Sequence, residues 1–280
     1  MFQQVTIVGL GLIGGSLGMA LKRRRLAKVV VGLSRRRVTL RRAKALGAID
    51  VGTTNPKRAI EAADLVVLAT PVETIMAQRR FTSFMRPGSL LTDVGSTKVR
   101  IVETFERSLP PQINFVGAHP LAGSAQRGIE AADARLFDEA ICILTPTPRT
   151  NRAALRQVKT FWAAMVDHVV TMSPHRHDQM LASTSHLPHA IAYALAGSVH
   201  SSLPHAPRSL LDMTRIAQSD PDLWDDIFLS NRRELLAALE RFNRHLRQFR
   251  QMLARGQRAK LRHWLSRAKR QRDALNDGEI

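Results

Sequence analysis

His119 is the residue of this chain best placed for acid–base chemistry. It follows an apolar run and precedes Pro120, and a histidine in such a turn titrates near neutral pH. Its imidazole could accept a proton from a substrate hydroxyl while hydride leaves the same carbon. Ser96, which follows the apolar run at residues 90–94, is the predicted hydrogen-bonding companion of His119. The alternatives are a loop histidine held by backbone groups and a serine that caps a helix beginning at Thr97.

A hydride acceptor is indicated by the first 14 residues of the chain. An apolar run at residues 5–8 leads into glycines at positions 9, 11 and 14, which is the spacing of a dinucleotide-binding turn. Gly9 permits the tight turn, Gly11 lets the backbone approach a pyrophosphate, and Gly14 lets the next helix pack against the strand. The first N–H groups of that helix, predicted over residues 15–21, would point at the phosphates. The predicted cofactor residues of the turn are Gly9, Gly11, Leu12, Ile13 and Gly14.

The residues after the second predicted strand favour NADP over NAD. The strand covers residues 29–33, and an NAD-selective site would usually place a carboxylate directly after it. This chain instead has Ser34 and Arg35, whose hydroxyl and guanidinium can both donate hydrogen bonds to a 2′-phosphate. The neighbouring Arg36 and Arg37 are either further phosphate ligands or part of a solvated face.

Four histidines, at positions 175, 177, 186 and 189, fall within one short segment. His186 and His189 are three residues apart, a spacing that metal ligands on a helix can have. No acidic or cysteine residue lies at ligand spacing from these two histidines, and Pro188 interrupts the turn between them. We therefore predict no metal site. One or two of these histidines are instead expected to line a substrate cleft.

Arg215 is the arginine of a mostly apolar segment. An arginine in such a segment is expected to pair with a carboxylate, which could be Asp212 or an acid group of a substrate. Trp224 lies a few residues further on and is either a hydrophobic wall of the site or part of the core. Arg215 and Trp224 are therefore candidate substrate-binding residues.

Short β-rich runs alternate with helical segments between residues 5 and 172, which predicts a doubly wound α/β sheet of the Rossmann type. Ligands bind at the carboxyl ends of such parallel strands, and both Ser96 and His119 follow strand ends. Thr70 and Pro71 close another run at the same edge and are added to the cofactor site. The predicted strands cover residues 5–8, 29–33, 65–69, 90–94, 115–118, 141–144 and 168–171.

The pattern changes at Ser173 and Pro174, which suit the N-cap and the first position of a helix. From there on the apolar periodicity is helical, and no convincing strand occurs. We therefore predict a Rossmann NADP-binding domain at residues 1–172. An all-helical substrate-binding and dimerisation domain follows at residues 173–280, and its broad apolar faces predict a homodimer.

Composition and charge exclude several classes of protein. Of the 280 residues, 44% are hydrophobic and 23% are charged, which is typical of globular rather than disordered chains. Cys142 is the only cysteine, so a disulfide framework is excluded and a reducing compartment, the cytoplasm, is predicted. No apolar stretch is long enough to span a membrane.

The formal net charge of +19 would suit nucleic acid, anionic lipid or small anionic substrates. Between Arg232 and Arg272 there are 14 Lys or Arg residues against two acidic ones. This segment has few aromatic residues and none of the zinc, homeodomain or RNA-recognition patterns. We therefore predict no nucleic-acid partner and interpret most of the charge as a solvated face that attracts anionic ligands.

Several motifs occur in the order found in one enzyme family. They are Gly9-Leu-Gly-Leu-Ile-Gly-Gly15, Asp93-Val-Gly-Ser-Thr-Lys98, Gly117-Ala-His-Pro-Leu-Ala-Gly123, Ser185-His-Leu-Pro-His189, Thr214-Arg-Ile-Ala217 and Trp224-Asp-Asp-Ile227. On these motifs the chain resembles the prephenate/arogenate dehydrogenases of tyrosine biosynthesis over nearly its whole length. The resemblance implies oxidative decarboxylation of a cyclohexadienol, in which hydride passes to nicotinamide, CO2 leaves and the ring becomes aromatic.

The resemblance also implies roles for individual residues. His119 matches the histidine that bonds the ring hydroxyl and accepts its proton, and Ser96 matches the serine that supports it. Arg215 matches the arginine that binds a substrate carboxylate. The positions that match contacts to the substrate side chain are Ser185 and His189. His177 matches a second family histidine, which we add to the substrate-binding candidates although its exact role is left open.

The resemblance favours arogenate as the substrate and NADP as the cofactor. The stretch at residues 123–128 and the pair Ser34-Arg35 look most like the cyanobacterial arogenate-type enzymes. Some prephenate-using relatives carry a glutamate where this chain has Ala125, so that contact does not carry over. We therefore predict an NADP-dependent arogenate dehydrogenase. Prephenate dehydrogenase and a dual-substrate cyclohexadienyl dehydrogenase are the alternatives, and NAD is the alternative cofactor.

Two other functions compete with this prediction. A β-hydroxyacid dehydrogenase would also join a dinucleotide domain to helices, but that family relies on a lysine in the helix after the sheet. This chain has no lysine between Lys159 and Lys260. A basic protein that uses a dinucleotide fold for redox sensing would instead bind nucleic acid with a steep salt dependence.

Overall fold

The computed structural model describes residues 1–124, 126–199 and 206–276, and Ala125 therefore lies outside the described residues. The chain forms two compact units, Met1–Arg232 and Arg233–Ile280. The first unit contains both β-sheets and all residues predicted for the site. The second unit is built from two long helices.

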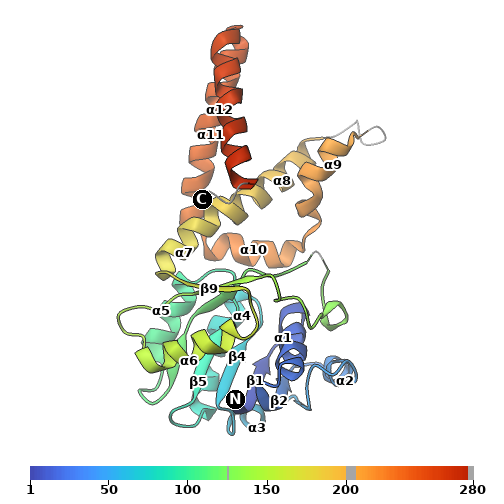
Figure 1. Cartoon of the computed structure of the whole chain (residues 1–280), viewed down its shortest axis with the longest axis vertical. Helices are drawn as coiled ribbons and strands as arrows, with labels where there is room; N and C mark the ends of the chain where they lie inside the picture. Colours follow the sequence, from blue (N-terminus) through green and yellow to red (C-terminus); the bar gives the residue numbers. More distant parts are fainter. Residues whose placement is uncertain (125, 200–205, 277–280) are drawn as a thin grey trace. The chain divides into compact units, whose positions relative to one another are not determined.

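A six-stranded parallel sheet forms the centre of the first unit (Figure 1). Its strand order is β3-β2-β1-β4-β5-β6, the order of a doubly wound dinucleotide-binding fold, which confirms the predicted fold class. Strand β3 is not among the predicted strands, because it has only three residues and none of them is buried. The strands are β1 (Phe2–Val8), β2 (Ala27–Leu33), β3 (Val51–Thr53), β4 (Leu65–Leu68), β5 (Leu90–Asp93) and β6 (Asn114–Val116).

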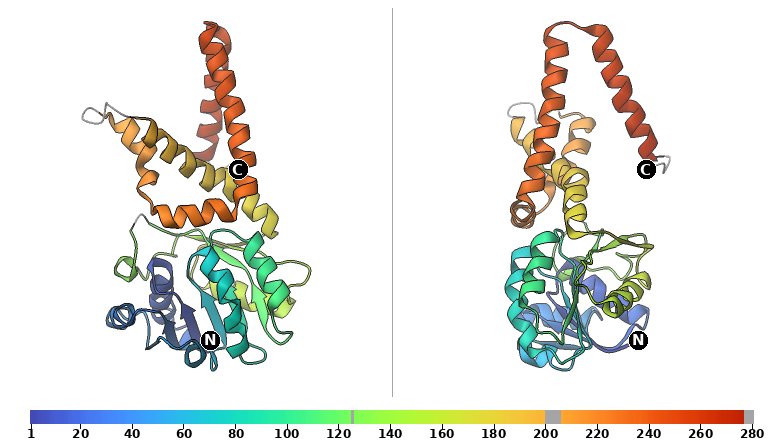
Figure 2. Two further views of the ribbon diagram at one scale, coloured as in Figure 1. Left: turned by 180° about the vertical axis from the view of Figure 1, so that it is seen from behind. Right: turned by 90° about the vertical axis from the view of Figure 1, so that its left-hand side faces the viewer.

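Helices cover both faces of this sheet because its side chains alternate between two cores (Figure 2). Val5 and Ile7 of β1 pack into the first core, whereas Val8 packs into the second. All four residues of β4 are buried, which explains the uninterrupted apolar sequence of this strand. The helices of the first core are α1 (Leu12–Arg23), α2 (Arg37–Ala45) and α6 (Arg152–Ala163). Those of the second are α3 (Pro56–Ile60), α4 (Val72–Ala77) and α5 (Val99–Ser108), with a 3-10 turn at Gln78–Phe84.

The last two predicted strands form part of a second sheet, so the parallel sheet is shorter than predicted. This three-stranded sheet has the order β7-β8-β9, with β7 (Ala118–Pro120), β8 (Ile141–Leu144) and β9 (His168–Thr171). Strand β7 runs antiparallel to β8, which a doubly wound sheet does not require. The run predicted at residues 115–118 divides at Gly117, between the end of β6 and the start of β7. An apolar pattern does not distinguish one strand from two short ones, and this is why the division was missed.

The described residues after position 172 contain no strand, as the sequence predicts. Helix α7 (Pro174–Leu181) begins where expected, because the Ser173 hydroxyl accepts a hydrogen bond from the Arg176 N–H at 3.3 Å. A π-helical turn (Ala182–His186) joins α7 to α8 (Leu187–Ser198). The elements that complete the first unit are α9 (Arg208–Thr214), a 3-10 turn (Arg215–Gln218) and α10 (Pro221–Ser230).

The second unit consists of α11 (Arg232–Ala254) and α12 (Arg258–Asn276), which diverge from a short turn (Figure 2). Near that turn the rings of Phe249 and Trp264 lie 5.5 Å apart. The arginines at positions 241, 244, 247 and 250 are all exposed, in agreement with their interpretation as a solvated face. No helix among the described residues is long and apolar enough to cross a membrane.

Candidate active site

The glycine-rich turn between β1 and α1 leaves no room for side chains at two of its positions. Gly9 has a φ of 98°, and a Cβ atom on it would lie 2.6 Å from the carbonyl oxygen of Ala69. A Cβ atom on Gly14 would lie 1.9 Å from the carbonyl oxygen of Gly9. A Cβ atom on Gly11, in contrast, would meet no atom within 4 Å, so the turn is open on this side.

This open turn fits the diphosphate of a dinucleotide. Helix α1 begins at Leu12, three residues before the predicted start, and no side chain caps its N-terminus. The N–H groups of its first turn, including those of Leu12 and Ile13, are therefore available to an anionic group. An open backbone approach and uncapped N–H groups are what a pyrophosphate requires.

Three neighbouring strand ends bring the other predicted cofactor residues to the same edge. Strands β2, β1 and β4 are adjacent, and their last residues are in register. Ser34 follows β2 and is half-buried, and the exposed Arg35 makes no ion pair with any described residue. Thr70 and Pro71 follow β4, and the Thr70 hydroxyl donates to Oε1 of Gln78 at 3.2 Å. The sheet thus places all the predicted cofactor residues along one edge.

His119 lies in strand β7 and not in a loop, which contradicts the alternative of a loop histidine. Residue 119 is 9% exposed and stands opposite Ile143 of β8. Nδ1 of His119 lies 2.8 Å from Nε2 of His177, and Nδ1 of His177 lies 2.7 Å from Oδ1 of Asp178. Side chains from β7 and α7 therefore form one continuous chain of hydrogen bonds.

Asp178 anchors this chain and also caps a helix. Its carboxylate accepts hydrogen bonds from the N–H groups of Lys98 at 2.7 Å and of Val99 at 2.9 Å. Asp178 of α7 therefore supplies the N-terminal cap of α5, although it is distant in sequence. The alternative in which Ser96 caps a helix from Thr97 is wrong, since α5 begins at Val99 and Asp178 binds its first N–H groups.

The hydrogen-bond acceptors in the series His119–His177–Asp178 determine which ring nitrogens carry protons. An ionised Asp178 can only accept, so Nδ1 of His177 must carry a proton. A neutral His177 then has its lone pair on Nε2, which must accept from the Nδ1–H group of His119. His119 is left with a lone pair on Nε2, and this atom could act as a base.

Burial keeps His119 and His177 neutral. It lowers the pKa of His119 well below the usual 6.5, and the nearby His177, Lys98 and His186 lower that pKa further. The expectation that this residue titrates near neutral pH is therefore wrong, because a strand position buries the ring that a turn would have exposed. Burial also lowers the pKa of His177, although the hydrogen bond to Asp178 opposes this effect. A neutral imidazole is the form that a general base requires.

A second group of predicted residues meets at Trp224. The rings of His189 and Trp224 are stacked, with centroids 3.5 Å apart and planes inclined by 20°. His186 approaches the same indole edge-on, at 6.1 Å between centroids. Nδ1 of His189 donates to the carbonyl oxygen of Ser185 at 2.9 Å, because a carbonyl can only accept. Trp224 is therefore a buried wall that holds His189 in place.

Asn231 connects this aromatic group to the hydrogen bonds that run from His119 through His177 to Asp178. Its side-chain amide donates to the backbone carbonyl of Asp178 at 2.8 Å and to Nδ1 of His186 at 3.1 Å. Burial lowers the pKa of His186 to about 4, so this ring is also neutral. We call the connected side chains the histidine assembly; they are His119, His177, Asp178, Asn231, His186, His189 and Trp224.

Ser96 and Arg215 are not joined to the histidine assembly by a hydrogen bond. Ser96 is half-buried between β5 and α5, and its hydroxyl makes no hydrogen bond with a described residue. Arg215 is exposed at the start of its 3-10 turn and makes no ion pair with Asp212 or any other described residue. Asp212, one of its two predicted partners, therefore does not pair with Arg215 in this structure.

The sequence analysis missed three polar residues that support the histidine assembly, namely Asp178, Lys98 and Asn231. A signal for Asp178 exists, because this acid directly follows His177 within a cluster of histidines. Asn231 has no such signal, because its partners are remote in sequence. Lys98 lies five residues after its ion-pair partner Asp93, but its bond to the Ala118 carbonyl joins residues 20 positions apart. The described residues contain no group of three His, Cys, Asp or Glu side chains that could hold a metal ion.

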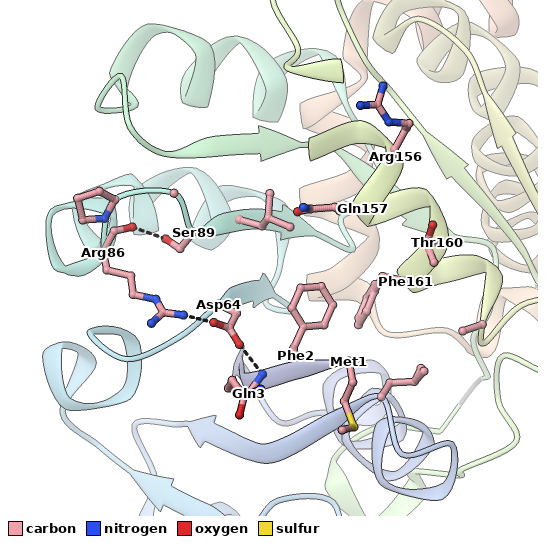
Figure 3. A pocket seen from close by; sticks show the side chains of 15 residues that line it. Met1, Phe2, Gln3, Asp64, Arg86, Ser89, Arg156, Gln157, Thr160 and Phe161 are labelled. Atoms are coloured by element: carbon pink, nitrogen blue, oxygen red, sulfur yellow. Dashed lines mark hydrogen bonds and ion pairs between the residues drawn. The ribbon is translucent and has the colours of Figure 1, made fainter. Parts of the chain in front are cut away.

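A hollow of about 760 Å³ lies at the opposite, amino-terminal edge of the sheet (Figure 3). It is lined by Phe2 and Phe161, and Arg86 forms an ion pair with Asp64 inside it. No predicted site residue lines this hollow. The candidate active site is therefore assigned from side-chain chemistry at the carboxyl ends of the strands, where parallel sheets bind ligands.

Two family models match the chain in succession. Residues 17–171 match the model described as prephenate dehydrogenase, nucleotide-binding domain. Residues 173–267 match the model described as prephenate dehydrogenase, dimerization domain. A prephenate dehydrogenase from Bacillus subtilis (strain 168) is 35% identical over 280 residues, which cover 97% of this chain and 76% of that protein.

Solved structures resemble the chain over almost its full length. Prephenate dehydrogenase from A. aeolicus, in complex with hydroxyphenyl propionate and NAD+, has a TM-score of 0.91 and 32% identity, covering 98% of this chain and 99% of that chain. Synechocystis arogenate dehydrogenase has a TM-score of 0.82 and 29% identity, covering 97% of this chain and 99% of that chain.

Proposed function

Because the chain belongs to the prephenate dehydrogenase family, we propose that it converts L-arogenate to L-tyrosine by oxidative decarboxylation, with NADP+ as the hydride acceptor. The observation that carries the proposal is the chain of hydrogen bonds from His119 through His177 to Asp178. Prephenate is the second candidate substrate, because the B. subtilis relative and the A. aeolicus structure are prephenate dehydrogenases.

The cofactor edge supports a nicotinamide dinucleotide, which supplies the hydride acceptor when bound. We assign the diphosphate to the open side of Gly11 and to the first N–H groups of α1. Ser34 and Arg35 support a 2′-phosphate, since a hydroxyl and an unpaired guanidinium stand where NAD-selective sites have a carboxylate. We assign Thr70 and Pro71 to the same cofactor, on the other side of the turn.

His119 takes the proton of the ring hydroxyl on its free Nε2. The resulting imidazolium donates through Nδ1 to His177, whose own Nδ1–H group donates to the Asp178 carboxylate. The negative charge of Asp178 thereby stabilises the positive charge that develops on His119. Loss of the proton and of hydride leaves a ring ketone. Departure of CO2 then leaves its bonding electron pair in the ring, which becomes aromatic, and the former ketone oxygen takes back the proton from His119.

The substrate lies, in this proposal, between His119 and the aromatic part of the histidine assembly. Ser96 is assigned to the ring hydroxyl and Arg215 to a carboxylate, because both have polar groups without a partner among the described residues. Ser185 and His189 are assigned to the side chain of the substrate, with Trp224 as the wall behind His189. His177, predicted as a substrate-binding residue, is instead fully buried with both ring nitrogens bonded, so we assign it a positioning role that acts through His119.

One assay tests both substrate and cofactor. The purified chain is mixed with arogenate or prephenate and with NADP+ or NAD+, and the absorbance of the reduced nicotinamide is followed. We expect the highest kcat/KM with arogenate and NADP+. Turnover of prephenate alone would select the second candidate substrate, and turnover of neither substrate would contradict the proposed function.

We assign cofactor binding to residues 1–172 and substrate binding and dimerisation to residues 173–280. The two family models meet at this boundary, and β9 ends at Thr171. The packing of the chain divides later, after Arg232, because α7 and α10 bond to the sheet domain. Asp178 binds the N-terminus of α5, and Asp226 accepts from the Glu73 N–H of α4 at 3.2 Å.

A homodimer through the C-terminal helices is supported by two findings. Residues 173–267 match a dimerization-domain model, and several large apolar side chains of these helices are exposed. The exposed side chains are Leu211, Met213, Leu229, Leu236, Leu246, Leu253 and Leu265. Light scattering after size exclusion should give twice the chain mass of 31.2 kDa, and a mass of one chain would contradict the dimer.

A further inference from the structure

A fully buried ion pair lies next to the strand that carries His119. Asp93 ends β5 and Lys98 precedes α5, and neither side chain has any exposed surface. The Lys98 ammonium is bonded to Oδ2 of Asp93, and the same oxygen accepts from the Gly95 N–H at 2.8 Å. The mechanism above uses neither charge.

The pair binds both polar backbone groups of Ala118, the residue before His119. The Ala118 N–H donates to Oδ1 of Asp93 at 3.2 Å, and the Lys98 ammonium donates to the Ala118 carbonyl at 2.8 Å. Strand β7 is at the edge of its sheet, with β8 on one side only. The ion pair therefore takes the place of a neighbouring strand for this residue.

Stability alone does not explain such a pair. Removing two charges from water offsets most of their mutual attraction, and apolar side chains of similar volume are often as stabilising. Apolar side chains, however, could neither bond the Ala118 backbone nor place a positive charge near His119. The bonds and the charge are thus what this pair contributes.

The charges around His119 come from several elements. His177 and Asp178 belong to α7, His186 to the π-helical turn, and Lys98 with Asp93 to the turn between β5 and α5. Burial favours the neutral form of the three histidines, and both carboxylates accept hydrogen bonds. Lys98 is therefore the cation of this group of described residues, and a nearby cation disfavours protonation of an imidazole.

We propose that Asp93 and Lys98 are positioning residues for His119. The pair holds β7 so that the imidazole meets His177, and the ammonium keeps that imidazole unprotonated and ready to act as a base. Neither residue touches the reacting atoms. The inference rests on the function proposed above for His119.

Lys98→Met tests this inference, with Lys22→Met as the matched control. Lys22 also pairs with an aspartate, Asp50, but both side chains are about one-third exposed, at 36% and 35%. In Lys98→Met we expect kcat to fall at least about tenfold, whereas KM for NADP+ changes by less than about twofold. The pKa of His119, followed by NMR of its ring proton, should rise by roughly half a unit or more. Lys22→Met should leave all three quantities unchanged.

A charge-free double variant, Asp93→Asn with Lys98→Met, excludes the effect of an unpaired buried carboxylate. It should retain the fold by circular dichroism and show the same fall in kcat, with a smaller rise in the pKa of His119 because the Asp93 charge is lost as well. A folded Lys98→Met or double variant with wild-type kcat and a wild-type pKa of His119 would overturn the inference. So would the failure of both variants to fold, since the pair would then be required for the fold itself.

The NMR measurement needs no substrate, and the resonance of His119 is assigned from its loss in His119→Asn. It therefore separates this inference from the proposed function. A wild-type chain that turns over neither arogenate nor prephenate would contradict the function. An unchanged pKa of His119 in Lys98→Met would contradict the positioning role alone.

Discussion

The cofactor turn and the histidine assembly are built in opposite ways. The turn is contained in Gly9 to Gly14, and the steric limit at Gly14 comes from Gly9 within the same turn, although Gly9 itself also packs against Ala69 of the neighbouring strand end. The histidine assembly collects side chains from β7, α7, the π-helical turn, α8 and α10, with Asn231 directly after α10. The bond between His119 and His177 joins residues 58 positions apart, and the bond between Asp178 and Lys98 spans 80. A local constraint is visible as a spacing in the sequence, whereas a distributed one depends on the fold.

This difference implies that the two regions can be damaged independently. Substitutions in the histidine assembly should change turnover and the response to acid while cofactor affinity is kept. Substitutions at the cofactor edge should change affinity or cofactor preference while turnover at saturation is kept. The predictions below test this separation.

The largest effect is expected for His119→Asn. Loss of the base should lower kcat by about 10²–10⁴-fold, since general-base catalysis contributes that much. The Kd for NADP+, measured by fluorescence titration, should change by less than about twofold. An unchanged kcat would refute the assigned role, and a large loss of NADP+ affinity would show that the two regions are coupled.

As the pH falls, the histidine assembly should lose stability before the cofactor turn is affected. The pKa of His186 is lowered by burial to about 4, whereas an unfolded histidine titrates near 6.5, so the unfolded state binds more protons below pH 6.5. The free energy of unfolding should therefore fall between pH 6.5 and about 4, by up to about 3 kcal/mol from His186 alone. Urea unfolding at several pH values measures this dependence.

His186→Asn provides the test variant and His175→Asn, at an exposed position, the control. The His186 variant should show a flatter dependence of stability on pH than the wild type. The His175 variant should follow the wild type. Equal dependence in all three proteins would mean that His186 is not buried as described.

A moderate effect is expected for Arg35→Asp at the cofactor edge. Removal of a charge-assisted hydrogen bond to the 2′-phosphate should raise KM for NADP+ by about 10–30-fold and KM for NAD+ much less. Arg37→Asp is the matched control, because it makes the same charge change two residues further on. Equal losses with both cofactors, or from both variants, would mean that the arginine run is only a charged surface.

The smallest effect is expected for Arg215→Gln. Its guanidinium is exposed and unpaired among the described residues, so its loss should mainly raise KM for the substrate, by about tenfold. The pH dependence of stability and the Kd for NADP+ should not change. Steady-state kinetics with arogenate and prephenate measure the effect, and a fall in kcat without a change in KM would contradict it.

Much of the fold was predictable because its signals are local. The alternation of apolar runs with helices indicated the doubly wound sheet, and Ser173 with Pro174 indicated the start of α7. The division at Gly117 was not predictable, because two short strands and one longer strand have the same apolar pattern. His119 was consequently expected at the edge of the parallel sheet, whereas it lies in an antiparallel pair.

The candidate site was predictable in its residue types but not in its connections. A histidine near a strand end and a glycine turn are visible in one sequence. The capping of α5 by Asp178 is not, since a cap is normally sought in the residue just before the helix. The pairing of Lys98 with the backbone of Ala118 is also invisible, because a backbone partner leaves no side-chain signature.

By itself the sequence indicated the glycine turn, the alternation of strands and helices and a candidate base, because each of these signals lies in residues that are neighbours along the chain. Only the tertiary structure decided which nitrogen of His119 is free, which carboxylate anchors His177 and which cation faces them. Those properties arise where distant segments meet in a buried, low-dielectric environment, and no spacing within one segment encodes them.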